Sequence, residues 1–448
     1  MIPQEMKMSL QELKIFTFLN ASNIRKSKGV ATTAVFTTIF MLGFQGETWF
    51  QQKFMSKKSD SLSGKDVVYR FLSQPTYNWK KFLLLLSSRL ISMCTRLTSD
   101  KRVNVLVLDD TLFSKSRSKS VELLSTVFDH TTMKYVKGFQ CLTLGWSDGA
   151  SFVPVNFSLV ASAKHLIKGI NESIDKRTCG FKRRIEATES KPKLAANMVK
   201  EALSSGINAS YVLMDTWFTE APLISSIMEQ GLDVIGMVKR GPKRLYQYRG
   251  QNYTAERLLK ILNRNMKNSE ILGSIHVTMG KSELPVKLVF IRHRNNPQKW
   301  LVLLSTDQSL SDEEIIRIYG YRWSIEVFFK CNKSHLNLGT EFQCRSYDAL
   351  IAHTTIVFSR YIFLAWEQRK SNDDKTLGYL FFEFGEDVSD VDFTEALLSL
   401  MNFILDIITS GKEEVVIKVS DFKNAVLTWL STLPKYLQTL LGVLLPAK

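Results

Sequence analysis

Two short apolar runs that lead directly into aspartate constrain the fold of this 448-residue chain most strongly. The first run, 103–108, is followed by Asp109 and Asp110, and the second, 211–214, is followed by Asp215. Short apolar runs rich in β-branched residues are typical of buried strands. Because neighbouring parallel strands end at the same edge of a sheet, side chains at their ends face one crevice. The sequence therefore predicts an α/β fold in which these acidic side chains lie close together.

The rest of the pattern divides the chain into helical ends and a mixed centre. Residues before about 100 show helical periodicity without strand alternation, and the pattern changes to strands near Arg102. Strands are also expected at 139–146, 152–160, 234–238, 275–278, 286–291 and 300–304, with helices at 194–204 and 221–230. We expect five segments: a helical N-terminal region (1–100), the first part of a core (101–245), a β-rich insertion (246–308), the last part of the core (309–370) and a helical C-terminal region (371–448).

The net charge limits the class of partner. Lys and Arg number 59 against 43 Asp and Glu, which gives +16 at pH 7 and a pI near 9.5. Such an excess favours a polyanionic partner, with nucleic acid ahead of anionic lipid. Apolar residues at 45% and charged residues at 23% are ordinary for a packed soluble protein, so a disordered or fibrous chain is excluded.

Cysteine use and the apolar runs bear on the compartment. The five cysteines include no pair spaced two residues apart, so neither a disulfide framework nor a cysteine-type zinc site is indicated. The longest apolar run near the N-terminus, 34–44, is well short of the roughly 18 residues of a spanning helix, and a secretory leader is not expected. We therefore expect a protein of the reducing cytoplasm that has no membrane partner.

A helix with a strong start signal carries a third acidic residue. Ser311 and Glu314 form a Ser-x-x-Glu capping box, and the helical pattern continues for about six turns. At about 100° per residue, four polar side chains of this helix fall within one arc of about 60°, beside an apolar stripe. They are Tyr319, Arg322, Glu326 and Lys333. Such a row of phenol, guanidinium, carboxylate and ammonium suits a metal ligand flanked by phosphate-binding groups.

The candidate catalytic and metal-binding residues are Asp109, Asp215 and Glu326. Carboxylate oxygens suit Mg²⁺ or Mn²⁺ rather than zinc. Two such ions, roughly 3.5–4 Å apart, can activate a water or hydroxyl and stabilise the leaving oxygen in phosphodiester chemistry. Each acid alone has a plainer interpretation, because Asp-Asp-Thr often forms a turn or cap and a helical glutamate is usually solvated. The position of Glu326 at the edge of a buried face favours its role as a metal ligand over that of a solvated residue.

The polar residues of the helix also resemble a known signature. Their spacing, Y-x2-R-x3-E-x6-K, is similar to the Y-R-E-K signature of the insertion-sequence-four family of bacterial DDE transposases. Residues 105–111 resemble the first aspartate block of that family, an apolar strand followed by Asp, any residue and Thr, and residues 211–218 resemble the second. The Asp-x-Thr spacing favours Asp109 as the first metal ligand, with Asp110 as the alternative.

This resemblance implies an RNase H-like catalytic core in which Asp109, Asp215 and Glu326 hold two Mg²⁺ or Mn²⁺ ions. An activated water would nick DNA at terminal inverted repeats, and the freed 3′-hydroxyl would attack the opposite strand and later the target DNA. In similar proteins the first attack leaves a hairpin end. The N-terminal helices would bind the repeats and the C-terminal helices would pair two protomers. The expected assembly is therefore a homodimer on double-stranded DNA, formed by a cytoplasmic, nucleoid-associated bacterial protein.

Basic and aromatic residues are the candidates for DNA contacts. The resemblance assigns contacts with DNA phosphates to Tyr319, Arg322 and Lys333. Trp300 and Trp323 are candidates for stacking on an exposed base, although core packing is the more common role of tryptophan. Further basic candidates lie before the second aspartate block and in or beside the insertion: Arg183, Arg184, Lys239, Arg240, Lys243, Arg244 and Arg292.

Three other functions compete with a transposase. Residues 108–113 resemble the opening of haloacid-dehalogenase phosphatases, but Val107 occupies the place of the nucleophilic aspartate and cannot form an aspartyl-phosphate. Membrane association through basic and apolar segments is the weakest competitor. A non-catalytic or domesticated DNA-binding protein that kept the fold is the main alternative, and the intact set of three acids argues against it.

Overall fold

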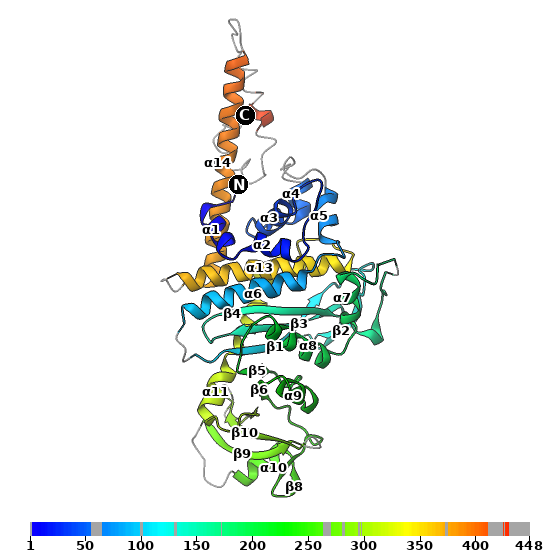
Figure 1. Ribbon diagram of the computed structural model, residues 1–448, viewed down its shortest axis with the longest axis vertical. Helices are drawn as coiled ribbons and strands as arrows, with labels where there is room; N and C mark the ends of the chain where they lie inside the picture. Colours follow the sequence, from blue (N-terminus) through cyan, green and yellow to red (C-terminus); the bar gives the residue numbers. More distant parts are fainter. Residues whose placement is uncertain are drawn as a thin grey trace. The chain divides into compact units, whose positions relative to one another are not determined.

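The structure is a computed structural model that describes residues 2–54, 65–98, 102–129, 132–171, 173–262, 270–279, 283–293, 296, 298–371, 375–410, 424 and 426–429. The chain forms two compact units. We call Lys80–Lys330 the sheet unit, and Met1–Trp79 with Cys331–Lys448 the helical unit. Figure 1 labels most of the helices and strands.

The strands of the sheet unit form one mixed sheet, with eleven strands in the described residues. Their order across the sheet is β2-β3-β1-β5-β6-β11-β10-β9-β7-β8, and β4 pairs with β3. The α/β class expected from the sequence is confirmed. The strands are β1 (Val105–Ser114), β2 (Ser125–Asp129), β3 (Lys134–Ser147), β4 (Phe152–Val160), β5 (Tyr211–Met214), β6 (Asp233–Met237), β7 (Tyr246–Tyr248), β8 (Gln251–Tyr253), β9 (Ile271–Met279), β10 (Leu284–Arg292) and β11 (Trp300–Ser305).

The centre of this sheet places the two aspartate-bearing strands side by side. β1 runs parallel to β5, with Val105 opposite Tyr211 and Leu108 opposite Met214, and β5 runs parallel to β6. The β1 residues from Val105 to Leu108 are completely buried. Parallel strands covered on both faces need continuous apolar runs, which is why this segment shows no polar alternation. The predicted pairing of the two runs is confirmed.

The first strand does not end at Leu108 as predicted. β1 extends to Ser114 because β3 supplies an antiparallel partner along its whole length, including Asp109 and Asp110. Its parallel neighbour β5 ends at Met214. Both aspartates therefore lie just past the end of β5, at the expected edge, although they remain within a strand. Because successive strand residues point to opposite faces, the two carboxylates have different surroundings.

The strands expected in the insertion continue the core sheet. β11 pairs antiparallel with β6, with Ser305 opposite Ile235, and β10, β9, β7 and β8 follow beyond it. Hydrogen bonding across that edge explains why the insertion is continuous with the core rather than a separate sheet. Several elements were not expected from the sequence, among them β2 (Ser125–Asp129), the helix α7 (Cys179–Ala187), the strands β7 and β8, and the helix α10 (Ala255–Leu262).

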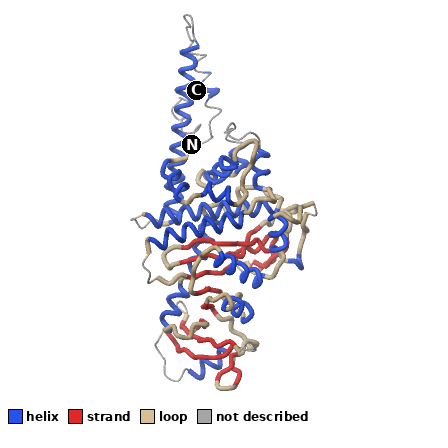
Figure 2. The backbone as a smooth tube through the Cα atoms, in the orientation of Figure 1, coloured by secondary structure: helices blue, strands red, loops and turns tan. Residues whose placement is uncertain are grey.

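Helices of the sheet unit pack on the sheet (Figure 2). α8 (Lys191–Ser204) contacts β3 and β4, α7 contacts β4, and α9 (Ala221–Met228) contacts β6. The buried side chains of α8, among them Leu194, Met198 and Val199, recur at helical spacing and form its sheet-facing side. The other described helices here are α6 (Trp79–Arg96), which begins at the unit boundary, η1 (Ala163–His165) and α10 (Ala255–Leu262).

The acid-bearing helix is two helices rather than the single one predicted from about 311 to 333. α11 (Asp312–Gly320) and α12 (Trp323–Ser334) are separated at Tyr321 and Arg322, where the backbone N–H groups bond to carbonyls only three residues earlier. The capping box at Ser311 and Glu314 is confirmed, since each side chain bonds to the backbone N–H of the other residue. Tyr319, Arg322 and Glu326 still lie side by side across this break, as predicted, whereas the position of Lys333 beside them stays a prediction.

The helical unit has α13 (Tyr347–Lys370) at its core. α1, α3, α5 and α14 pack on α13, which is buried from Tyr347 to Glu367. α13 is long and apolar enough to cross a membrane, but its apolar window is completely buried in the protein, as in a core helix. The other described helices of this unit are α1 (Gln4–Glu12), α2 (Ile15–Ala21), α3 (Thr32–Leu42), α4 (Trp49–Phe54), α5 (Lys65–Leu72) and α14 (Leu377–Ser410).

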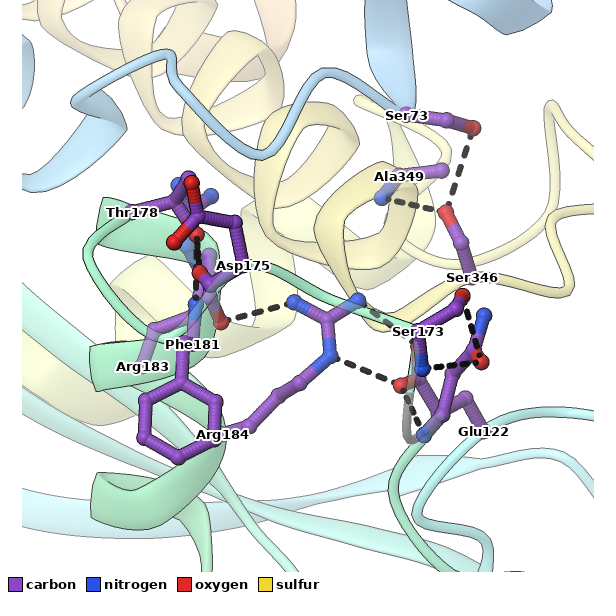
Figure 3. Close-up of polar contacts among 12 residues, drawn as sticks. Ser73, Glu122, Ser173, Asp175, Thr178, Phe181, Arg183, Arg184, Ser346 and Ala349 are labelled. Carbon is purple, nitrogen blue, oxygen red and sulfur yellow. Dashed lines mark hydrogen bonds and ion pairs between the residues drawn. The ribbon is translucent and has the colours of Figure 1, made fainter.

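The predicted helical character of both chain ends is confirmed for the described residues. Ser346 is the N-cap of α13: its Oγ accepts a hydrogen bond from the backbone N–H of Ala349 and donates one to the Oγ of Ser73 (Figure 3). Most of the C-terminal segment after Ser410 lies outside the described residues. The five-segment division, with its functional regions, stays a prediction.

Candidate active site

The acidic residues of β1 and β5 lie within electrostatic reach of each other. Burial raises the pKa of Asp109 to about 7, and the carboxylate of Asp215 adds to this, whereas Arg322 opposes it. Burial also raises the pKa of Asp215, against hydrogen bonds from the backbone N–H groups of Phe218 and Trp217. Both carboxylates therefore resist ionisation, mainly because they are buried and in part because another carboxylate lies nearby.

A guanidinium lies between two of the predicted acids. Arg322 donates from Nη1 to Oδ2 of Asp109 at 2.9 Å and from Nη2 to Oε1 of Glu326. The guanidinium carbon is 5.9 Å from the centroid of the Tyr319 ring. Burial raises the pKa of Tyr319, and Arg322 lowers it while Asp215 raises it further. The structure thus brings together five of the six residues of the acid triad and the Y-R-E-K signature.

The second aspartate of β1 has a different partner. Asp110 forms an ion pair with Nζ of Lys191, which lies in the first turn of α8. The same Nζ is 4.6 Å from the centroid of the Trp217 ring. Asp110 is also close enough to raise the pKa of Asp215. Asp110 therefore pairs with Lys191, whereas Asp109 pairs with Arg322.

The donor set fits a hard divalent cation in its chemistry. Asp109 and Asp215 offer carboxylate oxygens, which a hard divalent cation prefers, and the two carboxylates lie close enough to interact. Among the residues that the structure describes, no group of three or more His, Cys, Asp or Glu side chains is gathered closely enough for a metal ion. Glu326 in particular is held by Arg322. The two aspartates thus fit such an ion, and Glu326 would join them only after leaving Arg322.

One predicted DNA contact is a structural residue instead. The side chain of Arg184 is 1% exposed and donates to both carboxylate oxygens of Glu122, at 2.7 and 2.8 Å (Figure 3). It also donates to the carbonyl of Gly180 at 2.7 Å. A buried guanidinium in a complete ion pair is not accessible to a phosphate, so the DNA-binding prediction is wrong for Arg184. The adjacent Arg183 is half-buried and donates to the carbonyl of Cys179.

The remaining basic candidates differ in exposure. Lys239, Arg240, Lys243 and Lys333 are exposed, and Arg292 is half-buried. Arg244 donates hydrogen bonds to the carbonyl of Thr219 and the carboxylate of Glu220. Lys333 is in the last turn of α12 and belongs to the helical unit. Binding of DNA by these residues stays a prediction.

The two candidate tryptophans also differ. Trp323 is 64% exposed, so the expectation that core packing is its role is wrong. Trp300 is half-buried: its ring centroid is 5.8 Å from that of Phe290, and the guanidinium of Arg240 lies 4.7 Å from its ring. An arginine over an indole in this way is a cation–π contact, which leaves only part of Trp300 for a ligand.

Sequence reasoning missed two residues beside the acids, Lys191 and Trp217. Trp217 follows Asp215 by two residues. Its place directly after an acid at the end of a strand could have marked it as a site residue. Nothing in the sequence marks Lys191, because 81 residues separate it from Asp110 and only the folded sheet brings the two together.

Comparison with known proteins identifies the same region. A family model described as DDE superfamily endonuclease matches residues 53–250, and one described as transposase DDE domain matches 184–363. The first match includes Asp109 and Asp215, and the second includes Asp215 and Glu326. Together these matches support a DDE transposase.

The other comparisons add little to this result. Among solved structures, the Drosophila P element transposase strand transfer complex is similar at 9% identity and a TM-score of 0.22, with 88% of this chain and 92% of that chain covered. A likeness at that score carries no structural argument. Among curated proteins, none matches the chain.

Proposed function

We propose that this protein is a cut-and-paste DDE transposase of the insertion-sequence-four type, which cuts DNA at inverted-repeat ends and joins those ends to target DNA. The observation that carries the proposal is the cluster of Asp109, Asp215, Tyr319, Arg322 and Glu326 at one sheet edge. These residues come from three distant parts of the sequence, and two transposase or endonuclease family models cover them.

An RNase H-like core is the proposed frame of the site. Its support is the part of the sheet in which β4, β3 and β1 are antiparallel neighbours and β5 and β6 run parallel to β1. In this arrangement Asp109 lies on the central strand and Asp215 follows the adjacent one. Side chains from the end of parallel strands and a helix packed beside that end can then face one DNA backbone.

Each residue of the cluster has a proposed role. Asp109, Asp215 and Glu326 would hold Mg²⁺ or Mn²⁺, which supplies charge neutralisation and an activated nucleophile for in-line displacement at phosphorus. Arg322, which already pairs with two carboxylates, would bind a phosphate oxygen of the DNA. Tyr319 would orient this guanidinium from beside it. Asp109 is the proposed first ligand because it lies beside Asp215 and Arg322, whereas Asp110 would remain paired with Lys191.

The proposed partners are double-stranded DNA and a second copy of the chain. The net charge of +16 supports a polyanionic partner. Cutting and joining two element ends in one complex calls for at least two active sites, which is the argument for a homodimer. Repeat binding by the N-terminal helices and dimerisation by the C-terminal helices complete the proposal.

The test is a nicking assay on the DNA that borders the coding sequence, including its inverted repeats. With Mg²⁺ or Mn²⁺ and without ATP, we expect nicks at the repeat ends, and none in EDTA. Asp109→Ala, Asp215→Ala and Glu326→Ala should each bind DNA normally and lose roughly 10³-fold or more in cleavage rate, because several kcal/mol of charge stabilisation is removed. Glu313→Ala, in the exposed first turn of α11, is the control and should cut normally. Normal cutting by Glu326→Ala would contradict the assignment.

A DNA-binding protein without cleavage is the second candidate. It is favoured by one observation, the ion pairs of Arg322 with Asp109 and Glu326, which occupy two of the three proposed ligands. Tight binding to the repeats with no nicking in either metal would support this candidate over the transposase.

A further inference from the structure

An exposed tryptophan and a lysine lie beside the proposed acids without a role in the proposed reaction. The side chain of Trp217 is 45% exposed. Nζ of Lys191 lies 4.6 Å from its ring centroid and pairs with Asp110 at the same time. The Phe218 ring meets the indole at a steep angle, with 4.7 Å between centroids. The indole is thus held by two neighbours while much of it stays accessible.

The position of this indole is fixed with respect to Asp215. Oδ1 of Asp215 accepts hydrogen bonds from the backbone N–H groups of Trp217, at 2.9 Å, and Phe218, at 3.2 Å. Phe218 is 2% exposed, which anchors the turn in the core. Single exposed apolar side chains are ordinary on protein surfaces. This one differs because its backbone is tied to a proposed catalytic carboxylate, so anything that binds the ring is placed next to that carboxylate.

The ring lies between a group of carboxylates and one positive charge. Asp109, Asp110 and Asp215 lie close together and would repel a phosphate. Lys191 supplies positive charge at the edge of this group. An aromatic face next to a lysine is the combination that binds single-stranded nucleic acid, since the ring stacks on a base and the ammonium attracts the backbone.

We propose that Trp217 and Lys191 form a binding subsite for one unpaired nucleotide of the DNA strand, adjacent to the proposed metal ligands. The inference rests on the proposed function and extends it. The indole stacks on the base, and Lys191 contacts the phosphate of that nucleotide while it remains near Asp110. Because every base has a π-face, the subsite selects an exposed base rather than a particular sequence.

The experiment measures stacking separately from cutting. Duplexes from the DNA bordering the coding sequence each carry one 2-aminopurine, scanned across the repeat end, and bind the full-length protein in Ca²⁺. We expect a change in 2-aminopurine fluorescence at one position with the wild-type protein. Trp217→Ala and Trp217→Leu should lose this change and bind roughly tenfold more weakly, and Trp217→Phe should keep part of it. Lys191→Met should weaken binding mainly at low salt.

Matched controls come from the same unit. Tyr135→Ala removes another exposed aromatic ring, and Lys193→Ala removes an exposed lysine two residues along α8, so both should behave as wild type. Fluorescence that is unchanged in the folded Trp217 variants overturns the subsite, whether or not the wild-type protein cuts DNA. A wild-type protein that shows the Trp217-dependent change but never nicks overturns the transposase proposal and supports the subsite.

Discussion

At the scale of single residues, the candidate site places two carboxylates where ionisation is unfavourable. Asp109 and Asp215 are neighbouring carboxylates with little solvent around them, so ionising either one costs free energy in the folded state. Arg322 and Lys191 offset part of this cost through ion pairs with Asp109 and Asp110. A bound divalent cation would reduce the free-energy cost that remains.

The first prediction concerns Asp109→Asn in metal-free buffer. The pKa of Asp109 is about 7 in the folded protein, against an ordinary value near 4, so the folded state binds the extra proton between these limits. Stability from this group is therefore complete below about pH 4 and lost as pH rises through about 7. Asparagine cannot ionise, so the variant should gain stability over wild type as pH rises, by roughly 2–4 kcal/mol at pH 8.

Urea denaturation in EDTA at pH 5 and pH 8 measures this difference. Glu229→Gln, which changes an exposed carboxylate at the end of α9, should follow the wild-type profile at both pH values. A stability difference between Asp109→Asn and wild type that is the same at both pH values would contradict the raised pKa.

At the scale of elements, the sequence predicted strands better than junctions. The apolar runs at β1 and β5 identified buried parallel strands, because continuous burial leaves a local signature. The end of β1 was missed because it depends on pairing with β3, and β3 begins 20 residues after β1 ends. The split between α11 and α12 was missed because its residues continue a helical pattern, although the backbone N–H groups of Tyr321 and Arg322 bond to carbonyls three residues earlier.

The candidate site was predictable to a similar degree. Asp109, Asp215 and Glu326 could be found because each lies in a recognisable local pattern. Arg184 was misassigned because a basic run does not reveal that Glu122, 62 residues away, buries one of its members. Lys191 was missed for the same reason, since its pairing with Asp110 exists only in the folded sheet.

The second prediction concerns the turn that supports the junction of α11 and α12. Gly149 has φ +85°, and a Cβ there would lie 2.5 Å from Cζ of Tyr321. Gly149→Ala should therefore destabilise the protein by roughly 1–3 kcal/mol through backbone strain and overpacking. By displacing Tyr321 it should also misplace Arg322 and slow cleavage.

Thermal denaturation and nicking rates test this prediction together. Gly320→Ala is the control, because nothing lies within 4 Å of its added Cβ, and it should be neutral or stabilise by up to about 1 kcal/mol. Equal effects of the two substitutions would show that the Tyr321 contact does not matter.

At the scale of the whole molecule, the net charge bears on the proposed binding of DNA. The chain has a net charge of +16, yet its basic residues differ in availability, from the buried Arg184 to the exposed Lys239 and Lys243. Affinity for DNA should therefore depend on only some of the basic residues, and the net charge does not show which ones.

The third prediction is a salt dependence that separates these residues. Binding should weaken steeply as salt increases, since counterions are released from DNA. Lys239→Ala or Lys243→Ala should each reduce the slope of log affinity against log salt by about 1, if each contacts one phosphate. Lys260→Ala, on α10, serves as a control for loss of charge alone. Slopes that change equally in all three variants would mean that general charge, and not these contacts, governs binding.

The most direct test of the account is anomalous diffraction from a crystal of the protein with repeat-end DNA and Mn²⁺. The account predicts manganese coordinated by Asp109, Asp215 and Glu326, with Arg322 moved from Glu326 to a DNA phosphate. Manganese absent from these carboxylates, or bound through Asp110 with the Arg322 to Glu326 ion pair intact, would contradict it.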